Sequence, residues 1–144
     1  MIGQVIGGNY RVIFVREWPT DQIVSLYKEG GWWKDGYDPK GIPALITGSF
    51  LFAVALRKGE DEAVGMGRVI SDGVSDAYIQ DVVVKSDLRG DGIGGMIVRS
   101  LLKGCQERGL VWIGLIAEEG TEHFYTGIGF TPFPGRPMLF TGGI

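Results

Sequence analysis

Residues 81–105 read DVVVKSDLRGDGIGGMIVRSLLKGC, and this stretch decides the fold. The β-branched run Val82–Val84 predicts a strand, and the glycine-rich segment Arg89–Gly95 follows it after a polar corner. The apolar spacing beyond Gly95 predicts an amphipathic helix. A helix N-terminus that follows glycines presents bare N–H groups to an anion, because glycine allows positive φ and the helix dipole attracts negative charge. We therefore expect a phosphate-bearing ligand at this loop.

The same glycines match more than one kind of phosphate loop. Gly90-x-Gly92-x-x-Gly95 is a literal G-x-G-x-x-G, which marks dinucleotide sites when it joins a strand to a helix. The four residues Lys85–Leu88 separate the strand from the loop, whereas a dinucleotide loop turns directly after its strand. Three antiparallel strands are also predicted upstream, which disfavours a doubly wound sheet. A dinucleotide-dependent oxidoreductase stays as the weaker alternative.

The rest of the chain predicts alternating strands and helices. A helix should begin at Thr20 and end before Gly30, with capping and apolar spacing as signals. The short turns between the central strands predict an antiparallel meander, and the last long apolar run predicts a strand that is parallel to its neighbour and buried on both faces. The predicted strands are Asn9–Arg16, Ser49–Arg57, Ala63–Ile70, Asp76–Val84, Leu110–Ala117 and Pro137–Thr141, and the further helices are Ala44–Gly48, Gly95–Arg108 and Gly120–Ile128.

Composition excludes several functional classes. The chain has 144 residues, enough for one domain with a stable core, and a net charge of −3 argues against nucleic-acid binding through phosphates. No apolar run has the length of a membrane span, and the first residues show no secretory signal. The single cysteine, Cys105, fits a reducing cytoplasm and reads as a core residue. With one cysteine and one histidine, His123, we expect no metal site.

Two motifs resemble the GCN5-related N-acetyltransferase (GNAT) family. Arg89, Gly92 and Gly94 match the acetyl-CoA signature [Arg/Gln]-x-x-Gly-x-[Gly/Ala], and residues 123–130 (HFYTGIGF) resemble the family's F-Y-x-x-x-G-F ending. The order of elements also fits from about residue 10 to residue 140. Ser86 departs from the pattern, since many members have Pro there, and so does Asp91, where basic or polar residues are frequent. Neither change removes an amide that the ligand needs.

The resemblance implies one GNAT domain over residues 1–144. Its α+β fold would be a mixed, mostly antiparallel sheet of about six to seven strands, flanked by helices, with a splayed parallel pair at the CoA site. Acetyl-CoA would be the co-substrate, guided by the backbone of Val82, Val83 and Val84, where the N–H of Val83 or Val84 polarises the thioester carbonyl. Its pyrophosphate would lie on the loop residues Arg89, Gly90, Asp91, Gly92, Ile93, Gly94 and Gly95, with the Asp91 side chain turned to solvent.

The resemblance also suggests roles at the acceptor side, each with a structural alternative. Tyr125 would protonate the departing thiolate, or would be a core aromatic. Asp81 would bind the amine or act as its base, or would pair with Arg68. Glu118, Glu119 and Glu122 are further candidates for the base. Trp32 and Trp33 would line the acceptor pocket together with Tyr37, or would fill space under a loop.

The expected function is direct transfer of the acetyl group of acetyl-CoA to an amine. The sequence leaves open whether the acceptor is a small molecule or a protein amine. A non-catalytic CoA-sensing module is an alternative, because it needs the glycine loop but not Tyr125 or Asp81. A homodimer is compatible with the family, and we expect a cytoplasmic location without membrane or nucleic-acid partners.

Overall fold

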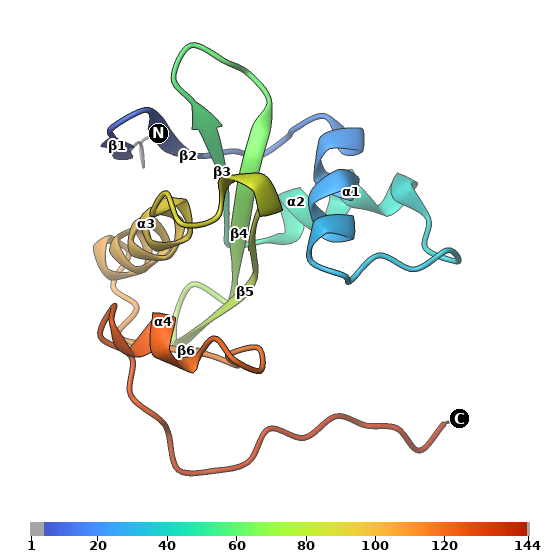
Figure 1. Cartoon of the computed structure of the whole chain (residues 1–144). Helices are drawn as coiled ribbons and strands as arrows, with labels where there is room; N and C mark the ends of the chain where they lie inside the picture. The colour runs from blue at the N-terminus through green and yellow to red at the C-terminus, as the bar shows by residue number, and fades with distance from the viewer. Residues whose placement is uncertain (1–4, 144) are drawn as a thin grey trace.

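The computed structural model of the protein describes residues 5–143, with side chains from residue 8 onward. Residues 1–4, part of the segment expected to lack a secretory signal, lie outside this range. A six-stranded sheet forms the centre, in the order β1-β2-β3-β4-β5-β6 (Figure 1). Its strands are β1 Val5–Gly7, β2 Tyr10–Phe14, β3 Leu51–Arg57, β4 Ala63–Ser71, β5 Asp76–Val84 and β6 Trp112–Leu115.

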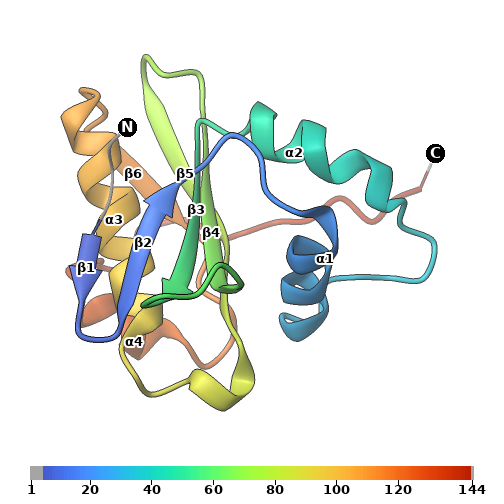
Figure 2. The same cartoon turned by 90° about the horizontal axis from the view of Figure 1, so that it is seen from above.

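Helices cover both faces of the sheet (Figure 2). The helix α3 packs on one face, and α1 and α2 pack on the other. Two buried clusters result, one around Ile97 and Leu101 of α3 and one around Ile23 and Leu26 of α1. The helices are α1 Thr20–Glu29, α2 Ile42–Gly48, α3 Ile93–Glu107 and α4 Glu122–Thr126, with short 3-10 turns at Pro39–Gly41 and Ser86–Leu88.

The sheet is mixed, as the sequence predicts. All neighbours from β1 to β5 are antiparallel, and β5 pairs with β6 in parallel after the α3 crossover. The predicted helix at Thr20 begins at that residue, and the strand Asp76–Val84 has the predicted bounds. Cys105 is fully buried in the α3 cluster, as expected of a core residue. Within residues 5–143, no helix is long and apolar enough to cross a bilayer.

Two predictions about strands are wrong, and one strand was not predicted. The strand that the sequence did not indicate is β1 Val5–Gly7, which pairs with β2 in a hairpin. Leu110–Ala117 is not buried on both faces: β6 covers Trp112–Leu115 at the sheet edge, and Val111 is 90% exposed. No strand forms at Pro137–Thr141, because that segment leaves the body and pairs with no strand in the described chain. An apolar run shows that burial is favourable, but it does not show whether a neighbouring strand exists.

The contact between α3 and β4 depends on Gly67. A Cβ built at Gly67 would lie 2.8 Å from Cγ2 of Ile97 and 3.1 Å from Cδ1 of Leu101. Both of these side chains are fully buried, so they have little room to move away. The missing side chain thus sets how closely α3 approaches the sheet.

We therefore expect Gly67→Val to lower the free energy of unfolding by about 1–3 kcal/mol, because overpacking forces buried side chains from their rotamers. Urea unfolding followed by circular dichroism measures this change. Gly48→Ala is the control, since Gly48 ends α2, has no positive φ, and leaves nothing within 4 Å of a Cβ built there. Wild-type stability for Gly67→Val would contradict the packing described.

Candidate active site

A β-bulge interrupts the pairing of β4 with β5. Met66 pairs with Val83 and Arg68 pairs with Gln80, so two residues of β5, Asp81 and Val82, face the single residue Gly67. Asp81 takes the positive φ of 60° that this bulge requires. It is the only described non-glycine residue with positive φ, and aspartate tolerates that conformation better than most residues. The bulge redirects β5 just before it reaches the glycine loop.

Beyond the bulge, one side of β5 has no neighbouring strand. The parallel pairing with β6 runs from Asp76 opposite Trp112 to Ile79 opposite Leu115, and β5 then continues to Val84 alone on that side. A cavity of about 490 Å³ lies at this opening. It is lined by the bulge residues and their neighbours, by the end of β6 and by three aromatic side chains; the lining set is Trp32, Tyr78, Ile79, Gln80, Asp81, Val82, Leu115, Ile116, Ala117, Glu118, Glu119 and Tyr125.

Backbone polar groups face this opening. The N–H of Lys85 donates to the carbonyl oxygen of Val64 on β4 at 2.9 Å. Because backbone groups alternate in direction along a strand, the N–H of Val83 faces β4 and the N–H of Val84 faces the opening. The Val84 carbonyl fits this orientation, since it accepts Nε of Arg89 at 3.2 Å. The side chains of Val83 and Val84 are buried on opposite faces of the sheet.

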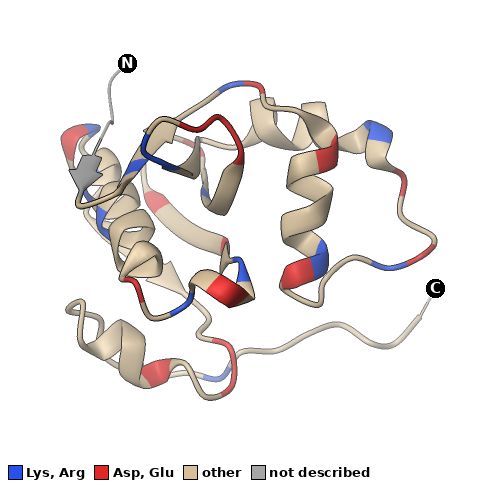
Figure 3. Ribbon diagram, turned by 45° about the horizontal axis from the view of Figure 1, so that its top comes forward, with Lys and Arg blue, Asp and Glu red and all other residues tan. Residues whose placement is uncertain are grey.

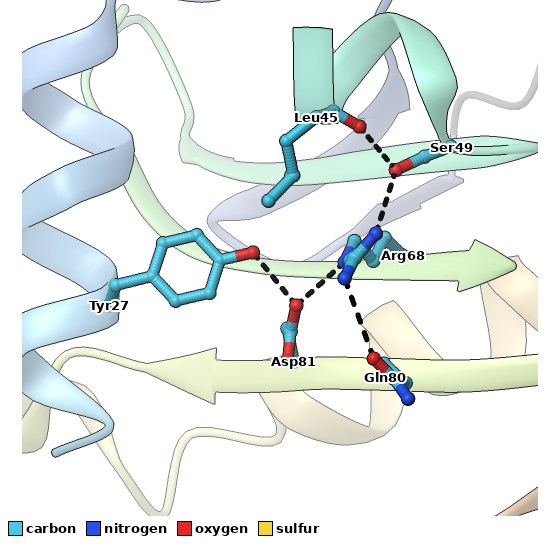
Figure 4. A network of polar contacts seen from close by, with 6 residues as sticks. All are labelled: Tyr27, Leu45, Ser49, Arg68, Gln80 and Asp81. Carbon is cyan, nitrogen blue, oxygen red and sulfur yellow. Dashed lines mark hydrogen bonds and ion pairs between the residues drawn. The ribbon is translucent and has the colours of Figure 1, made fainter. Parts of the chain in front are cut away.

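Asp81 is held in place by a polar network (Figure 4). Its Oδ2 accepts Nε of Arg68 at 2.6 Å and the hydroxyl of Tyr27 at 2.7 Å. Arg68 also reaches Oγ of Ser49 and Oε1 of Gln80, each at 3.4 Å. The ion pair that the sequence left as an alternative for Asp81 is therefore formed. Within the described chain, these bonds use Oδ2 and leave Oδ1 without a protein donor.

Tyr27 supports this network from α1. Burial, followed by the nearby Asp81 carboxylate, raises the pKa of the Tyr27 hydroxyl above its ordinary value. The hydroxyl therefore stays protonated and keeps donating to Asp81. Tyr27 is 7% exposed and packs edge-on against Trp32, with ring centroids 6.2 Å apart. The same residue thus links the bulge to the aromatic loop after α1.

The glycine loop ends in an uncapped helix N-terminus. Gly92 is the N-cap of α3 with φ of 82°, and no side chain caps the helix. The first helical bond runs from the N–H of Met96 to Gly92, so the N–H groups of residues 93–95 lack intrahelical partners. Gly90 also has a positive φ, of 97°. Only glycine adopts these two conformations without strain, which explains the glycine spacing in the motif.

The side chains around the glycine loop leave its backbone N–H groups accessible to an anion. Arg89 is tied to β5 through Nε, so its terminal nitrogens remain available. The carboxylate of Asp91 accepts the hydroxyl of Tyr10 at 3.1 Å, and this bond holds its charge on the β2 side at the surface. Arg99 lies over Gly95, where a built Cβ would be 2.6 Å from its Nη1. Arg99 is a second cation near the loop, and the motif did not indicate it. Its position one helical turn after Gly95 could have predicted that it lies beside the loop.

Tyr125 reaches the cavity from α4. Its ring contacts Phe124 and Phe130, with centroids 4.8 and 5.8 Å away, and Phe124 in turn lies against Gly94, 3.3 Å from a built Cβ. The F-Y motif and the glycine loop are therefore neighbours in space. Burial, with Glu118 as a second cause, raises the pKa of Tyr125. Its hydroxyl is protonated at neutral pH, which is the form that a proton donor needs.

The aromatic loop after α1 meets the end of β6. Nε1 of Trp32 donates to Oε1 of Glu118 at 2.9 Å, and both residues line the cavity. Trp33 lies outside the cavity lining and packs on Tyr27 and Tyr37. Of the two tryptophans expected at the acceptor side, the structure thus brings Trp32 to the cavity. Tyr78 and Glu118 also line it, although the sequence indicated Glu118 only as one of several carboxylates.

Metal-ligating side chains do not cluster in the part of the chain that the structure describes. His123 is exposed on α4. The cavity instead combines backbone amides, two engaged carboxylates and a protonated phenol. Such an arrangement can bind a polar extended ligand along β5 and place it against an acid and a carboxylate.

Comparisons with known proteins agree with this geometry. The model of the "Acetyltransferase (GNAT) family" matches residues 12–130. The "GCN5-related N-acetyltransferase 2, chloroplastic" of Arabidopsis thaliana is 32% identical over 78 residues, which cover 54% of this chain and 30% of that protein. The "Uncharacterized N-acetyltransferase ycf52" of Pyropia yezoensis is 30% identical over 114 residues, or 78% of this chain and 65% of that one. The chain thus spans less than two thirds of either relative.

The fold has close counterparts among solved structures. A probable acetyltransferase of unknown function from meticillin-resistant Staphylococcus aureus superposes with a TM-score of 0.77 at 20% identity, over 91% of this chain and 98% of that one. The family match extends from β2 to the turn after α4. This chain belongs to the GCN5-related N-acetyltransferase family.

Proposed function

We propose that the chain transfers the acetyl group of acetyl-CoA directly to an amine bound in the cavity beside Asp81. The GNAT family uses acetyl-CoA as co-substrate, so acetyl transfer is the activity to which the family match points. One observation carries the proposal: β5 has an unpaired edge beside the cavity, and the chain continues from the end of β5 through the glycine loop to the uncapped N-terminus of α3. An extended ligand with a terminal pyrophosphate fits this path from end to end.

The residues present fit the donor. Amides of Gly90–Gly95 and the free ends of Arg89 would bind the pyrophosphate, and Arg99 adds a second cation beside them. The pantetheine arm would lie along β5 and use backbone groups there as a neighbouring strand would. The orientation of the backbone favours the N–H of Val84 for the arm, and we assign the N–H of Val82, which lines the cavity, to the thioester carbonyl. The sequence also suggested the N–H of Val83 for the thioester carbonyl, but that N–H faces β4.

The acceptor would lie on the carboxylate side of the cavity. Asp81 uses Oδ2 for Arg68 and Tyr27 and has no protein donor on Oδ1 within the described chain, so we assign the ammonium to Oδ1. Glu118 also lines the cavity, and its Oε1 accepts the indole N–H of Trp32, so we assign it the proton of the amine. The aromatic walls Trp32, Tyr78 and Tyr125 favour an acceptor whose cationic amine is joined to an apolar group.

The proposed reaction is a direct displacement in which all bonds and protons are accounted for. The amine nitrogen attacks the acetyl carbon while the N–H of Val82 stabilises the oxyanion. The carbon–nitrogen bond forms, the carbon–sulfur bond breaks and its electron pair goes to sulfur. Tyr125 donates its proton to the departing thiolate. The bound ammonium first gives one proton to Glu118, which frees the nitrogen lone pair for the attack, and Glu118 passes this proton to solvent. The second proton leaves the nitrogen when the amide forms and returns through solvent to Tyr125, so the acid is restored.

Acceptor-dependent release of the CoA thiol tests this proposal. A panel of arylalkylamines, amino acids, aminosugars and peptides is offered with acetyl-CoA, and released thiol is followed with a chromogenic reagent. Cys105 is fully buried, and burial raises the pKa of its thiol to about 11, so the protein itself contributes little signal. We expect release with cationic aromatic amines above all others. Calorimetric binding of acetyl-CoA without release from any acceptor would instead support a CoA sensor.

Gly92→Ala tests whether the glycine loop binds acetyl-CoA. Gly92→Ala places a side chain at φ of 82°, which costs about 1–2 kcal/mol of strain, and it should weaken acetyl-CoA binding measured by calorimetry. Gly48→Ala, far from the loop in sequence and free of positive φ, should bind normally. NADH is titrated in parallel. Tight binding of NADH with none of acetyl-CoA would favour the oxidoreductase and refute the proposal.

Tyr125→Phe tests the proton donor. Loss of a positioned acid lowers turnover by about 10²-fold or more, so kcat should fall while calorimetric affinity for acetyl-CoA stays the same. Because the pKa of Tyr125 is raised, the wild-type acid remains protonated through neutral and mildly alkaline pH, and its ionisation should limit kcat only at still higher pH. The Phe variant should lack that alkaline decline. Equal turnover of both proteins at every pH would remove the acid role.

Asp81→Asn tests the ammonium contact. A hydrogen bond to a charged group contributes about 1.5–3 kcal/mol, so the KM for a cationic acceptor should rise by about 10-fold or more. The KM for acetyl-CoA should not change. Asp76→Asn is the matched control, since Asp76 is an exposed carboxylate at the start of the same strand. If the variant loses stability but keeps the acceptor KM, Asp81 serves only to hold the bulge.

A further inference from the structure

The backbone conformation of residue 30 does not explain why it is a glycine. Gly30 is the C-cap of α1 with φ of −76° and ψ of −8°, a right-handed helical conformation that residues with side chains adopt without strain. The next residue, Gly31, has the positive φ of 76° that favours glycine. Packing explains Gly30 instead, because a Cβ built there would lie 2.7–2.8 Å from three carbons of the Trp32 ring. The indole therefore lies directly on the bare backbone at the end of α1.

This position brings the indole to the segment that follows β6. Nε1 of Trp32 donates to Oε1 of Glu118 at 2.9 Å, and we call this contact the Trp32–Glu118 bridge. The backbone of Glu118 is fixed to the start of α4, because its carbonyl oxygen accepts the N–H of Thr121 at 2.9 Å and the hydroxyl of Thr121 at 2.7 Å. Figure 3 shows the acidic segment after β6 on the side of the molecule toward which the C-terminal end of α1 points. The bridge thus joins the loop after α1 to the segment after β6.

The Trp32–Glu118 bridge forms part of the cavity wall. Both of its residues line the cavity of about 490 Å³, as do Asp81 and Tyr125. Neighbouring extended chains need a spacing of about 4.8 Å. The two atoms of the bridge are 2.9 Å apart, so a polypeptide that enters between the loop after α1 and the segment after β6 must break it. A small amine inside the cavity leaves the bridge intact.

We propose that Gly30 is a positioning residue that selects the acceptor: by letting Trp32 bond Glu118, it favours a small primary amine over the α-amine of a polypeptide. This inference rests on the proposed acetyl transfer and specifies its acceptor. The bridge also holds the carboxylate to which we assign the proton of the amine. A small amine therefore meets Asp81 and Glu118 in their present positions, whereas a peptide first has to separate Glu118 from Trp32.

Gly30→Ala should open the bridge without changing any residue that lines the cavity. Carbon atoms in contact lie about 3.5–4.0 Å apart, so the indole must move by about 1 Å, and its hydrogen bond is stretched beyond a useful length. The variant should resist urea at least as well as the wild type, since alanine suits this φ and restricts the unfolded chain. Gly36→Ala is the matched control: Gly36 lies in the same loop, has no positive φ and leaves nothing within 4 Å of a built Cβ.

Nitrogen-15 NMR of the indole N–H groups tests the bridge without any turnover. The Trp32 resonance is assigned by its loss in Trp32→Phe. In Gly30→Ala it should move upfield and its hydrogen should exchange faster with water, because a bonded N–H becomes free. In Gly36→Ala it should match the wild type. An unchanged Trp32 resonance in Gly30→Ala would overturn the role of Gly30.

Two acceptors that share one amine environment test the selection. Phenylethylamine and a tripeptide that begins with phenylalanine both carry a phenyl ring two carbons from the nitrogen, but only the tripeptide continues as a main chain. We expect the wild type to prefer phenylethylamine. In Gly30→Ala the ratio of kcat/KM for the tripeptide to that for phenylethylamine should rise by about 10-fold or more, because the peptide no longer has to break a hydrogen bond to a charged group. Comparison of this ratio between variants cancels the different basicity of the two amines.

A second background shows whether Gly30 acts through the indole. Trp32→Ala should raise the same ratio, and Gly30→Ala should add nothing in that background, because no ring is left to displace. The KM for acetyl-CoA should stay the same in all of these variants. A general loss of packing at residue 30 would instead lower turnover of both acceptors equally and would persist without Trp32.

The outcomes distinguish this inference from the proposed function. Equal use of the two acceptors by the wild type, or an unchanged ratio in Gly30→Ala, would overturn the selection while acetyl transfer stands. If no amine is acetylated, the proposed function fails, and calorimetric binding of the two acceptors to the acetyl-CoA complex replaces turnover. The wild type should then bind phenylethylamine more tightly, and Gly30→Ala should reduce that preference. Equal affinity of the wild type for both would overturn the inference.

Discussion

The positive φ of Asp81 is the constraint on which the site depends. Residues in such conformations cost of order 1–3 kcal/mol and persist only when their surroundings hold them. Arg68 from β4 and Tyr27 from α1 do so here, both through Oδ2 of Asp81. The parallel pairing of β5 with β6 ends at Ile79, two residues before Asp81, and the bulge puts Gly67 opposite Asp81 and Val82, on the face where Ile97 of α3 packs. The bulge, the open end of β5 and the cavity thus meet at Asp81.

The sequence predicts β5, the glycine loop and α3 well because their signals are local. A β-branched strand, positive-φ glycines and an amphipathic helix follow one another within 25 residues, and each is recognisable without knowledge of the rest. The bulge is different, since it depends on the register between β4 and β5, which no local pattern encodes. For the same reason the pairing of Asp81 with Arg68 stayed an alternative until the register was known. The partial burial of β6 and the lack of a strand at residues 137–141 likewise depend on which strands lie beside them, and no local pattern shows that.

Three carboxylates line the cavity, and two of them, Asp81 and Glu118, differ in their partners. Nε of Arg68 lies 2.6 Å from Oδ2 of Asp81, so the Asp81 carboxylate is part of an ion pair. Glu118 accepts only a neutral indole N–H and acts on Tyr125, where its charge helps to raise the pKa of the phenol. Burial is the larger cause of that raised pKa, and the charge of Glu118 adds to it. If Glu118 takes up the proton of the amine, as we propose, this charge is neutralised and the phenol becomes easier to ionise.

The strand β6 belongs to both the cavity and the edge of the sheet. Leu115 is its last residue, and residues 115–119 continue from it along the cavity wall to Glu118. A strand with a neighbour on each side has less freedom than an edge strand with one, because further ladder bonds must break before it can move. Because β6 is an edge strand, β5 alone holds the strand from which the segment leads to Glu118, whose side chain meets Trp32.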